Sequence, residues 1–185
     1  CEAKEGNYIV YFPSYEYMSG VVKAFRELSP DTECAVQSRS MSYGERNAFL
    51  EKFSKRDGTL VGFCVLGGAF AEGVDLKGEK LIGTIIVGTG LPKMCSELNI
   101  LSEYFEKTRE NGRDYAYTYP AMIKVEQAAG RVIRSETDRG VVVLVDDRYA
   151  EPATYRLFPK NWRHIKYTGD PYSLNTALYR FWGEE

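Results

Sequence analysis

Short apolar runs alternate along this chain with longer stretches of helical periodicity, and this alternation restricts the possible folds more than any other feature. Five runs are rich in β-branched and aromatic residues and are predicted to be strands: 8–12, 33–37, 59–66, 81–87 and 140–145. A strand that is followed by a helix and then by another strand indicates a βαβ unit, which places its two strands in parallel. The sequence therefore predicts an α/β fold with a mostly parallel sheet that is flanked by helices.

The stretches between the runs carry helix signals of their own. Residues 15–28 place apolar side chains three and four apart, and Pro30 ends the pattern. Ser42 and Glu45 have the spacing of a capping box, which predicts a helix from 43 to about 55. Further helices are expected at the stretches 96–109, 120–133 and 173–181.

Charge and length exclude several classes of protein. The 185 residues suffice for one domain and not for two large ones. With 24 Lys and Arg against 26 Asp and Glu, the chain is not a uniformly basic nucleic-acid binder. The stretch 107–166 nevertheless holds 12 basic residues against 8 acidic ones. That excess indicates either a face that attracts phosphate or an unevenly charged solvated surface, and charge alone leaves both open.

The cysteines predict neither zinc binding nor disulfides. Cys1, Cys34, Cys64 and Cys95 lie far apart without a C-x-x-C pair, so we expect free thiols. Cys34 and Cys64 lie in apolar, strand-like stretches and are expected to act as small apolar side chains. No apolar run approaches the roughly 18 residues of a membrane span, and no signal peptide opens the chain. We expect a cytoplasmic protein without membrane association, cut from a longer one because it starts at Cys1 without a methionine.

In parallel sheets ligands bind at the carboxyl ends of the strands, so the loops that open at Pro13, Gly67, Gly88 and Asp146 are the first places to look. The loop 67–75 holds glycines that let backbone amides approach a phosphate, although a flexible turn has the same composition. The triplet 88–90 lacks the third glycine of a dinucleotide-binding loop and is a weak signal.

Two acidic residues close the last predicted strand. Asp146 and Asp147 resemble the strand end that holds Mg²⁺ in P-loop NTPases. However, no G-x-x-x-x-G-K-[ST] loop occurs in the chain, so nothing here cradles a triphosphate unaided. We expect no metal site in this chain, and we expect Asp147 to form a local ion pair or cap with Arg148.

The segment Q-A-A-G-R-V-I-R at 127–134 carries the strongest chemical signal. On a helix Gln127, Arg131 and Arg134 would share one face, and two guanidinium groups beside an amide suit the oxygens of a polyphosphate. The alternative is a solvated helix face on which the arginines pair with Glu126 and Glu136.

Several motifs in a fixed order together resemble a known family. A strand that ends in Pro13-Ser14, a helix with G-E-R at 44–46, the loop A-F-A-E-G-V-D, then Q-A-A-G-R-V-I-R and D-R-G-V-V-V-L-V-D-D-R resemble motifs IV, V and VI of superfamily 2 helicases. Their particular forms are similar to the DinG and XPD branch. The resemblance covers residues 8–148.

The resemblance implies a RecA-like three-layer fold and identifies residues 1–185 as the second of two RecA-like domains that sandwich ATP. It gives Arg131 and Arg134 the role of reaching the γ-phosphate, with Gln127 beside them. It makes Asp75 the ribose-contacting acid in a loop shaped by Glu72 and Gly73. It also places Ser14 and Gly68 against the backbone of a single strand.

The partners and cofactors are likewise implied by the resemblance. The N-terminal RecA-like domain of the same polypeptide would hold ATP and Mg²⁺, and the pair of domains would move 5′ to 3′ along single-stranded DNA. An iron–sulfur cluster would belong to the first domain and not to this chain. Tyr15, Tyr117 and Tyr119 are either base-stacking or core residues. The alternative is a stand-alone α/β module that binds nucleic acid or protein without any role in ATP hydrolysis.

Overall fold

A computed structural model describes residues 2–54, 58–70, 80–133, 137–162 and 164–183 of the chain. Five strands form one sheet in the order β2-β3-β1-β4-β5, and all four pairings are parallel. The strands are β1 (Asn7–Phe12), β2 (Glu33–Val36), β3 (Leu60–Val65), β4 (Gly83–Val87) and β5 (Val141–Val145). The α/β class and the parallel sheet predicted from the sequence are therefore confirmed.

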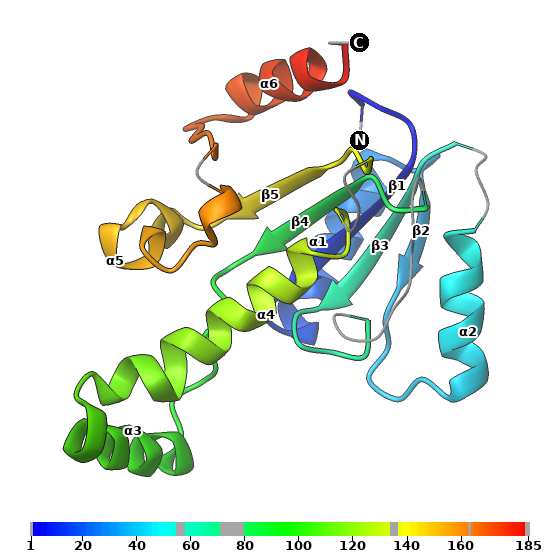
Figure 1. Cartoon of the computed structure of the whole chain (residues 1–185). Coiled ribbons are helices and arrows are strands. Elements are labelled where there is room, and N and C mark those ends of the chain that lie inside the picture. Colours follow the sequence, from blue (N-terminus) through cyan, green and yellow to red (C-terminus); the bar gives the residue numbers. More distant parts are fainter. Residues whose placement is uncertain (1, 55–57, 71–79, 134–136, 163, 184–185) are drawn as a thin grey trace.

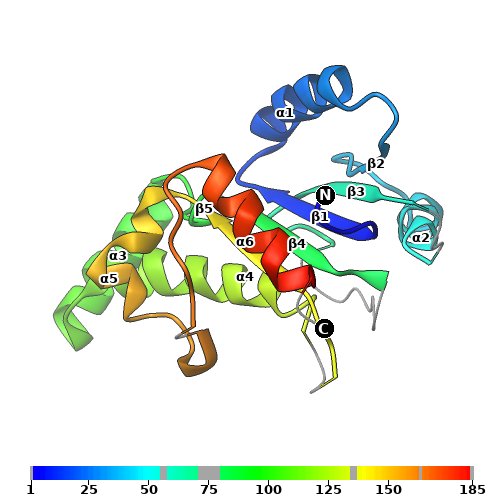
Figure 2. The same cartoon turned by 90° about the horizontal axis from the view of Figure 1, so that it is seen from above.

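Helices cover both faces of this sheet (Figures 1 and 2). Helix α1 (Tyr15–Leu28) lies on one face, and helices α2 (Tyr43–Lys52) and α4 (Tyr119–Ala129) lie on the other. Helix α3 (Ser96–Arg109) stands away from the sheet beyond the start of α4, and none of its residues is buried. The result is the three-layer arrangement that the resemblance implied.

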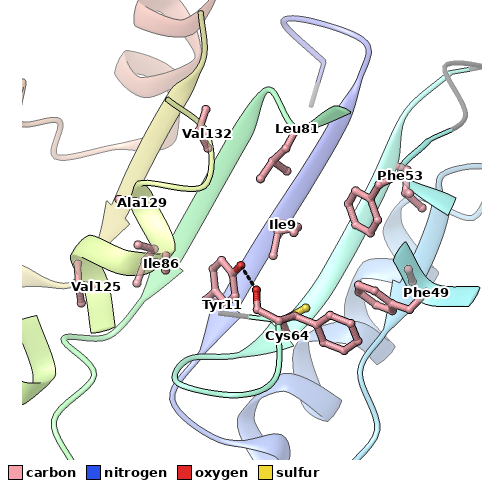
Figure 3. Packing of buried hydrophobic residues seen from close by; sticks show 14 of the residues in the cluster. Ile9, Tyr11, Phe49, Phe53, Cys64, Leu81, Ile86, Val125, Ala129 and Val132 are labelled. Carbon is pink, nitrogen blue, oxygen red and sulfur yellow. Dashed lines mark hydrogen bonds between the residues drawn. The ribbon is translucent and has the colours of Figure 1, made fainter. Parts of the chain in front are cut away.

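The pleat of the strands divides the core into two clusters. Ile9 and Tyr11 of β1 face the side of α2 and α4, where Phe49 and Val125 pack (Figure 3). Phe12, next along the same strand, faces the opposite side and joins the cluster beneath α1. Because successive side chains of a strand point to opposite faces, each central strand supplies both clusters, which is why the apolar runs are continuous.

Side-chain caps fix the starts of the first two helices. The Ser14 hydroxyl accepts a hydrogen bond from the Tyr17 amide at 3.2 Å, and α1 keeps its predicted bounds. The predicted capping box of α2 is also present: Ser42 Oγ accepts from the Glu45 amide, and the Glu45 carboxylate accepts from the Ser42 amide at 2.7 Å. Hydrogen bonds from Ser42 hold the pKa of Glu45 below its usual value.

A π-helical segment that the sequence did not predict leads into α4. This segment, η2 (Asp114–Thr118), runs directly into α4 without a break, because Thr118 and Tyr119 both have helical backbone angles. Pro120 has no amide hydrogen, so an α-helix that continued through it would lose one hydrogen bond. The wider turn of η2 lets the backbone reach Pro120 in the first turn of α4.

After α4 the chain differs from the expected helix. The prediction of a helix to Ile133 is too long, because α4 ends at Ala129. The amides of Arg131 and Val132 donate hydrogen bonds to carbonyls three residues earlier in the chain, so the chain forms a turn there. After β5 come the short segments η3 (Asp147–Ala150), α5 (Pro152–Tyr155) and η4 (Lys160–Trp162), and then helix α6 (Pro171–Gly183).

Cysteines behave as the sequence suggested in the part of the chain that the structure covers. Cys64 is fully buried in the core and burial raises the pKa of its thiol, while Cys34 is half-buried with a raised pKa from the same cause. Cys34, Cys64 and Cys95 are free thiols. Among the described residues no helix is both long and apolar enough to cross a membrane.

Candidate functional site

The predicted site residues that the structure describes fall at two opposite ends of the sheet. We call the loops that follow the strands the carboxyl end, and the residues that precede them the amino end. Helix α4 runs between the two ends of the sheet. Near its middle, Lys124 packs beside Gly67, which follows β3. Three residues past its end, Val132 packs against Gly140, which precedes β5. Ser14 and Gly68 lie at the carboxyl end, whereas Arg131 lies at the amino end.

A buried glutamine ties Ser14 and Gly68 to one surface. Gln37, only 5% exposed, accepts a hydrogen bond from the Val65 amide at 2.9 Å and donates one to the Tyr15 hydroxyl at 3.0 Å. Tyr15 follows Ser14 directly, and Gly68 packs so closely that a Cβ atom there would lie 2.9 Å from Gln37 Nε2. The glycine at 68 is therefore required by packing against Gln37.

The start of α1 adds a positive end and a cation to this surface. The amides of its first turn point toward the carboxyl end, where a helix N-terminus favours an anion. The Arg39 guanidinium lies 4.9 Å from the centre of the Tyr15 ring. An aromatic ring, a guanidinium and a helix N-terminus on one surface suit a nucleic-acid backbone and its bases.

The other two tyrosines named from the sequence have packing roles. Tyr117 is 7% exposed and its hydroxyl donates to Asn99 Oδ1 at 2.7 Å, so its ring is not available to a base. Tyr119 is half-buried and packs edge-on against Tyr115, with 5.1 Å between the ring centres. Of the three, Tyr15 has the most suitable surroundings for stacking.

At the amino end the structure brings Gln127 and Arg131 to the same end of α4. Gln127 is exposed in the last turn of the helix, and Arg131 is half-buried in the turn that follows. The expected helical face is not continuous, because the helix ends at Ala129 and Gly130. Burial raises the pKa of Glu126, the residue proposed as a surface partner for the arginines.

Four predicted site residues lie outside the described part of the chain. They are Glu72, Gly73, Asp75 and Arg134. Their neighbours are placed: Phe70 is buried and its carbonyl accepts a hydrogen bond from the Tyr11 hydroxyl at 2.9 Å (Figure 3). The carbonyl of Lys80, the next described residue, accepts a hydrogen bond from the Asn7 side chain.

Asn7 was not selected by any sequence pattern. It is 4% exposed, and its side-chain amide donates to the carbonyls of Phe53 and Lys80 at 2.9 and 3.0 Å. It thereby anchors Lys80, the first described residue after the segment that contains Asp75. Gln37 was missed for the same reason, because a polar residue in or next to a strand shows no partner until distant segments are brought together.

Asp146, the first of the two acidic residues after β5, forms a cap. Arg148 makes two side-chain hydrogen bonds to Asp146, both at 2.7 Å, and its amide donates to the same carboxylate. The Arg148 side-chain bonds hold the pKa of Asp146 below its usual value. The expected local ion pair exists, but Asp146 makes it instead of Asp147, because Asp146 is the N-cap of η3. No cluster of three potential metal ligands occurs within the described ranges.

A model of the helicase C-terminal domain matches residues 1–165 of the chain. The chain belongs to this family. Since the match covers most of the chain, it includes both ends of the sheet. It also includes every site residue that was selected from the sequence.

Individual relatives agree with this assignment. The chain is 33% identical over 166 residues to a probable ATP-dependent helicase of Methanocaldococcus jannaschii, covering 81% of the chain and 25% of the relative. It is 31% identical over 150 residues to the ATP-dependent DNA helicase YoaA of Haemophilus influenzae, covering 80% of the chain and 22% of the relative. The chain thus spans a quarter or less of these relatives.

Solved structures extend the likeness to the fold. An XPD helicase structure matches with a TM-score of 0.66 and 26% identity, and the match covers 82% of this chain and 26% of that one. The predicted RecA-like fold and the resemblance to the DinG and XPD branch are therefore confirmed.

Proposed function

We propose that this chain is the second RecA-like motor domain of an ATP-dependent DNA helicase. One observation carries the proposal: the residues suited to a phosphate and those suited to a nucleic acid lie at opposite ends of one sheet, joined by α4. Gln127 and Arg131 lie at the C-terminal end of this helix, while its middle packs beside Gly67. A domain built in this way contacts ATP with one end and a single strand with the other.

At the amino end, Arg131 and Arg134 would contact the γ-phosphate, with Gln127 beside them. A guanidinium donates two parallel hydrogen bonds to phosphate oxygens and stabilises the charge that spreads over the transferring phosphoryl group. The chain has no P-loop, so ATP and Mg²⁺ would be held mainly by the first RecA-like domain of the same polypeptide. Asp75 would contact the ribose from a loop shaped by Glu72 and Gly73.

At the carboxyl end, Ser14 and Gly68 would lie against the backbone of the single strand. The N-terminus of α1 would face a phosphate, and Tyr15 with Arg39 would face a base. The direction of travel would be 5′ to 3′, and a translocation assay on oligonucleotides blocked at either end tests it. An iron–sulfur cluster, where the parent protein has one, would be bound outside this chain.

The decisive experiment changes Arg134 to Ala in the full-length parent protein. We expect ATP turnover to fall by roughly 10³-fold or more, as for the loss of an arginine finger, while single-strand binding stays within about twofold. Arg109→Ala, on the exposed last turn of α3, is the matched control for loss of one positive charge. Normal ATP turnover by Arg134→Ala would show that the arginine has another role.

A second experiment separates the motor domain from a stand-alone binding module. The purified 185 residues should bind ATP weakly and should not hydrolyse it, because the phosphate cradle is missing. Robust hydrolysis by this chain alone would contradict the proposal. A parent coding sequence without a G-K-[ST] loop before Cys1 would favour the stand-alone module. A cytoplasmic location stays a prediction, which fractionation of cells that express the parent protein tests.

A further inference from the structure

A lysine in the middle of α4 reaches the carboxyl end of the sheet. Lys124 lies three residues after Ala121 and four residues before Ala128, which are both buried. Its side chain therefore starts on the side of α4 that packs against the sheet, and the lysine is half-buried. A lysine in such a place buries its alkyl stem and extends its ammonium group toward water.

The stem of Lys124 lies across Gly67, in the turn that follows β3. A Cβ atom on Gly67 would lie 3.2 Å from Lys124 Cδ, 3.3 Å from Cε and 3.7 Å from Nζ. Gly67 is exposed and has a φ of +73°, a conformation that glycine adopts without strain. The ammonium group is thus held beside backbone that no side chain covers, and a stem that is already ordered loses less entropy when a ligand binds.

The ammonium group of Lys124 has no partner in the part of the chain that the structure describes. Lys124 forms neither a hydrogen bond nor an ion pair there. Within the same ranges, the side-chain nitrogens and oxygens that are closed to water and lack a partner are the hydroxyls of Thr84 and Thr89. Because Lys124 Nζ is not one of them, it is open to solvent and available to an anion.

The turn beside Lys124 belongs to the proposed strand surface. Gly68, the next residue, packs on Gln37, which donates a hydrogen bond to the Tyr15 hydroxyl. Arg39 lies over the ring of the same tyrosine. Two cations from distant parts of the sequence, Arg39 and Lys124, therefore border one surface, and a strand that passes from Tyr15 over Gly68 and Gly67 would meet both.

We propose that Lys124 binds a backbone phosphate of the single strand where the strand passes Gly67. A lysine binds phosphate as a point charge and reads no base, which suits a motor that moves along any sequence. This inference rests on the proposed function, because it assumes that a single strand crosses the carboxyl end.

The substitution Lys124→Met removes the charge and keeps an unbranched stem beside Gly67. In the full-length parent protein it should lower the slope of log affinity against log salt for single-stranded oligo-dT by about 0.7, the loss of one phosphate contact. The same relation predicts roughly fivefold weaker binding at about 0.1 M salt and equal binding near 1 M salt. Fluorescence anisotropy over a series of salt concentrations measures the slope and the affinities.

Three further variants separate the phosphate contact from other effects of the change. Lys124→Gln also lacks the charge but has a polar stem, so it should give the same slope as Lys124→Met if one of the two folds poorly. Lys124→Arg keeps a cation and should retain the wild-type slope. Lys23→Met is the matched control, because it removes a lysine charge from the exposed middle of α1 and should leave the slope unchanged.

A neutral linkage in the strand tests the same contact from the side of the ligand. An oligo-dT that is no longer than the binding site binds in one register, and one uncharged methylphosphonate linkage can be moved along it. At one position this linkage should weaken binding by the wild type roughly fivefold and binding by Lys124→Met not at all. The partner of the missing charge is already absent from that variant.

The outcomes distinguish this inference from the proposed function. Tight binding with equal salt slopes for the wild type, Lys124→Met and Lys124→Gln would overturn the inference and leave the proposed function in place. The inference would also be wrong if every uncharged linkage weakened Lys124→Met as much as the wild type. A higher KM for ATP with an unchanged salt slope would assign Lys124 to the nucleotide and overturn it too. Absence of strand binding by the wild-type parent would contradict the proposed function as well.

Discussion

The carboxyl end and the amino end of the sheet are built in different ways. At the carboxyl end, polar side chains lock the loops to one another: Gln37 joins the start of α1 to the end of β3, and Tyr149 holds the loop after β4. At the amino end, Asn7 ties down two carbonyls, while Gln127 and Arg131 extend from the last turn of α4 and the turn after it.

This difference indicates how each end acts. The carboxyl end is a preformed surface, whose glycines and buried amides fix a shape before any ligand arrives. Under the proposed function, the amino end would supply Gln127 and Arg131 to a ligand that is held mainly by another domain.

The largest expected effect is a loss of ATP hydrolysis from a change at the amino end alone. In the full-length parent, Arg131→Ala should lower kcat for ATP hydrolysis by about 10³-fold with single-strand affinity unchanged, since under the proposed function the arginine would contact the γ-phosphate and not the strand. Arg131→Lys keeps the positive charge but cannot donate two parallel hydrogen bonds as a guanidinium does. The rate of this variant should therefore lie between those of Arg131→Ala and the wild type. Steady-state hydrolysis and fluorescence anisotropy measure the two quantities. A parallel loss of strand binding would mean that the two ends are not separate.

Asn7→Ala should have the next largest effect. It leaves the buried carbonyls of Phe53 and Lys80 without their donor, which should cost roughly 3 kcal/mol of unfolding free energy. Because Lys80 borders the loop that carries Asp75, the KM for ATP should rise while strand binding stays normal. Urea unfolding of this chain and kinetics of the parent measure these changes. A rise in KM without loss of stability would show that Asn7 acts on ATP directly.

Gln37→Ala is the counterpart at the carboxyl end. It removes the partners of the Val65 amide and the Tyr15 hydroxyl and should cost roughly 2 kcal/mol of unfolding free energy. We expect weaker single-strand binding with an unchanged KM for ATP, the reverse of Asn7→Ala. If both variants changed the same property, the two ends would form one site.

Asp146→Asn should have a smaller effect that depends on pH. The folded pKa of Asp146 lies below its unfolded value, so its ion pair stabilises the fold above the unfolded pKa and that stability is lost as the pH falls through the folded pKa. Because Arg148 is 47% exposed, we expect about 0.5–1 kcal/mol at neutral pH. The difference in unfolding free energy from wild type should shrink as the pH falls through the folded pKa of Asp146, and a difference that stays constant with pH would contradict this account.

The smallest effect concerns Arg139, just before β5. Its guanidinium lies 5.0 Å from the ring centre of Phe181 and 5.6 Å from that of Trp182, both in α6. Arg139→Ala should cost about 0.5 kcal/mol of unfolding free energy, as for an exposed cation–π contact. Arg139→Lys, which keeps a cation, should cost less. Thermal unfolding of the two variants makes the comparison.

Local signals made most of the fold predictable. The ranges of α1 and α3 agree with those expected. At α1 the capping Ser14 and at α3 the break at Asn111-Gly112 act within a few residues of the helix ends. The end of α4 was not predictable in the same way. The sequence after Ala129 keeps an apolar pattern, but Val132 turns to pack against Gly140, a contact that depends on where β5 lies.

The polar framework of the two ends was beyond the reach of sequence patterns. Gln37 bonds to a residue 28 positions away, and Asn7 to residues 46 and 73 positions away. Lys124 likewise packs beside Gly67 from a distant part of the chain. Arginines and glutamine in a motif could be selected because their chemistry is local, whereas partners brought together by topology could not.

Helix α4 has a consequence for how the two ends affect each other. Its 11 residues make a rod of about 16 Å whose buried side includes Val125, Ala128 and Ala129. A rod packed in this way moves as a unit, so a shift imposed at one end reaches the other. Any such linkage is reciprocal: if nucleotide changes the affinity for the strand by a given factor, the strand must change the affinity for nucleotide by that same factor.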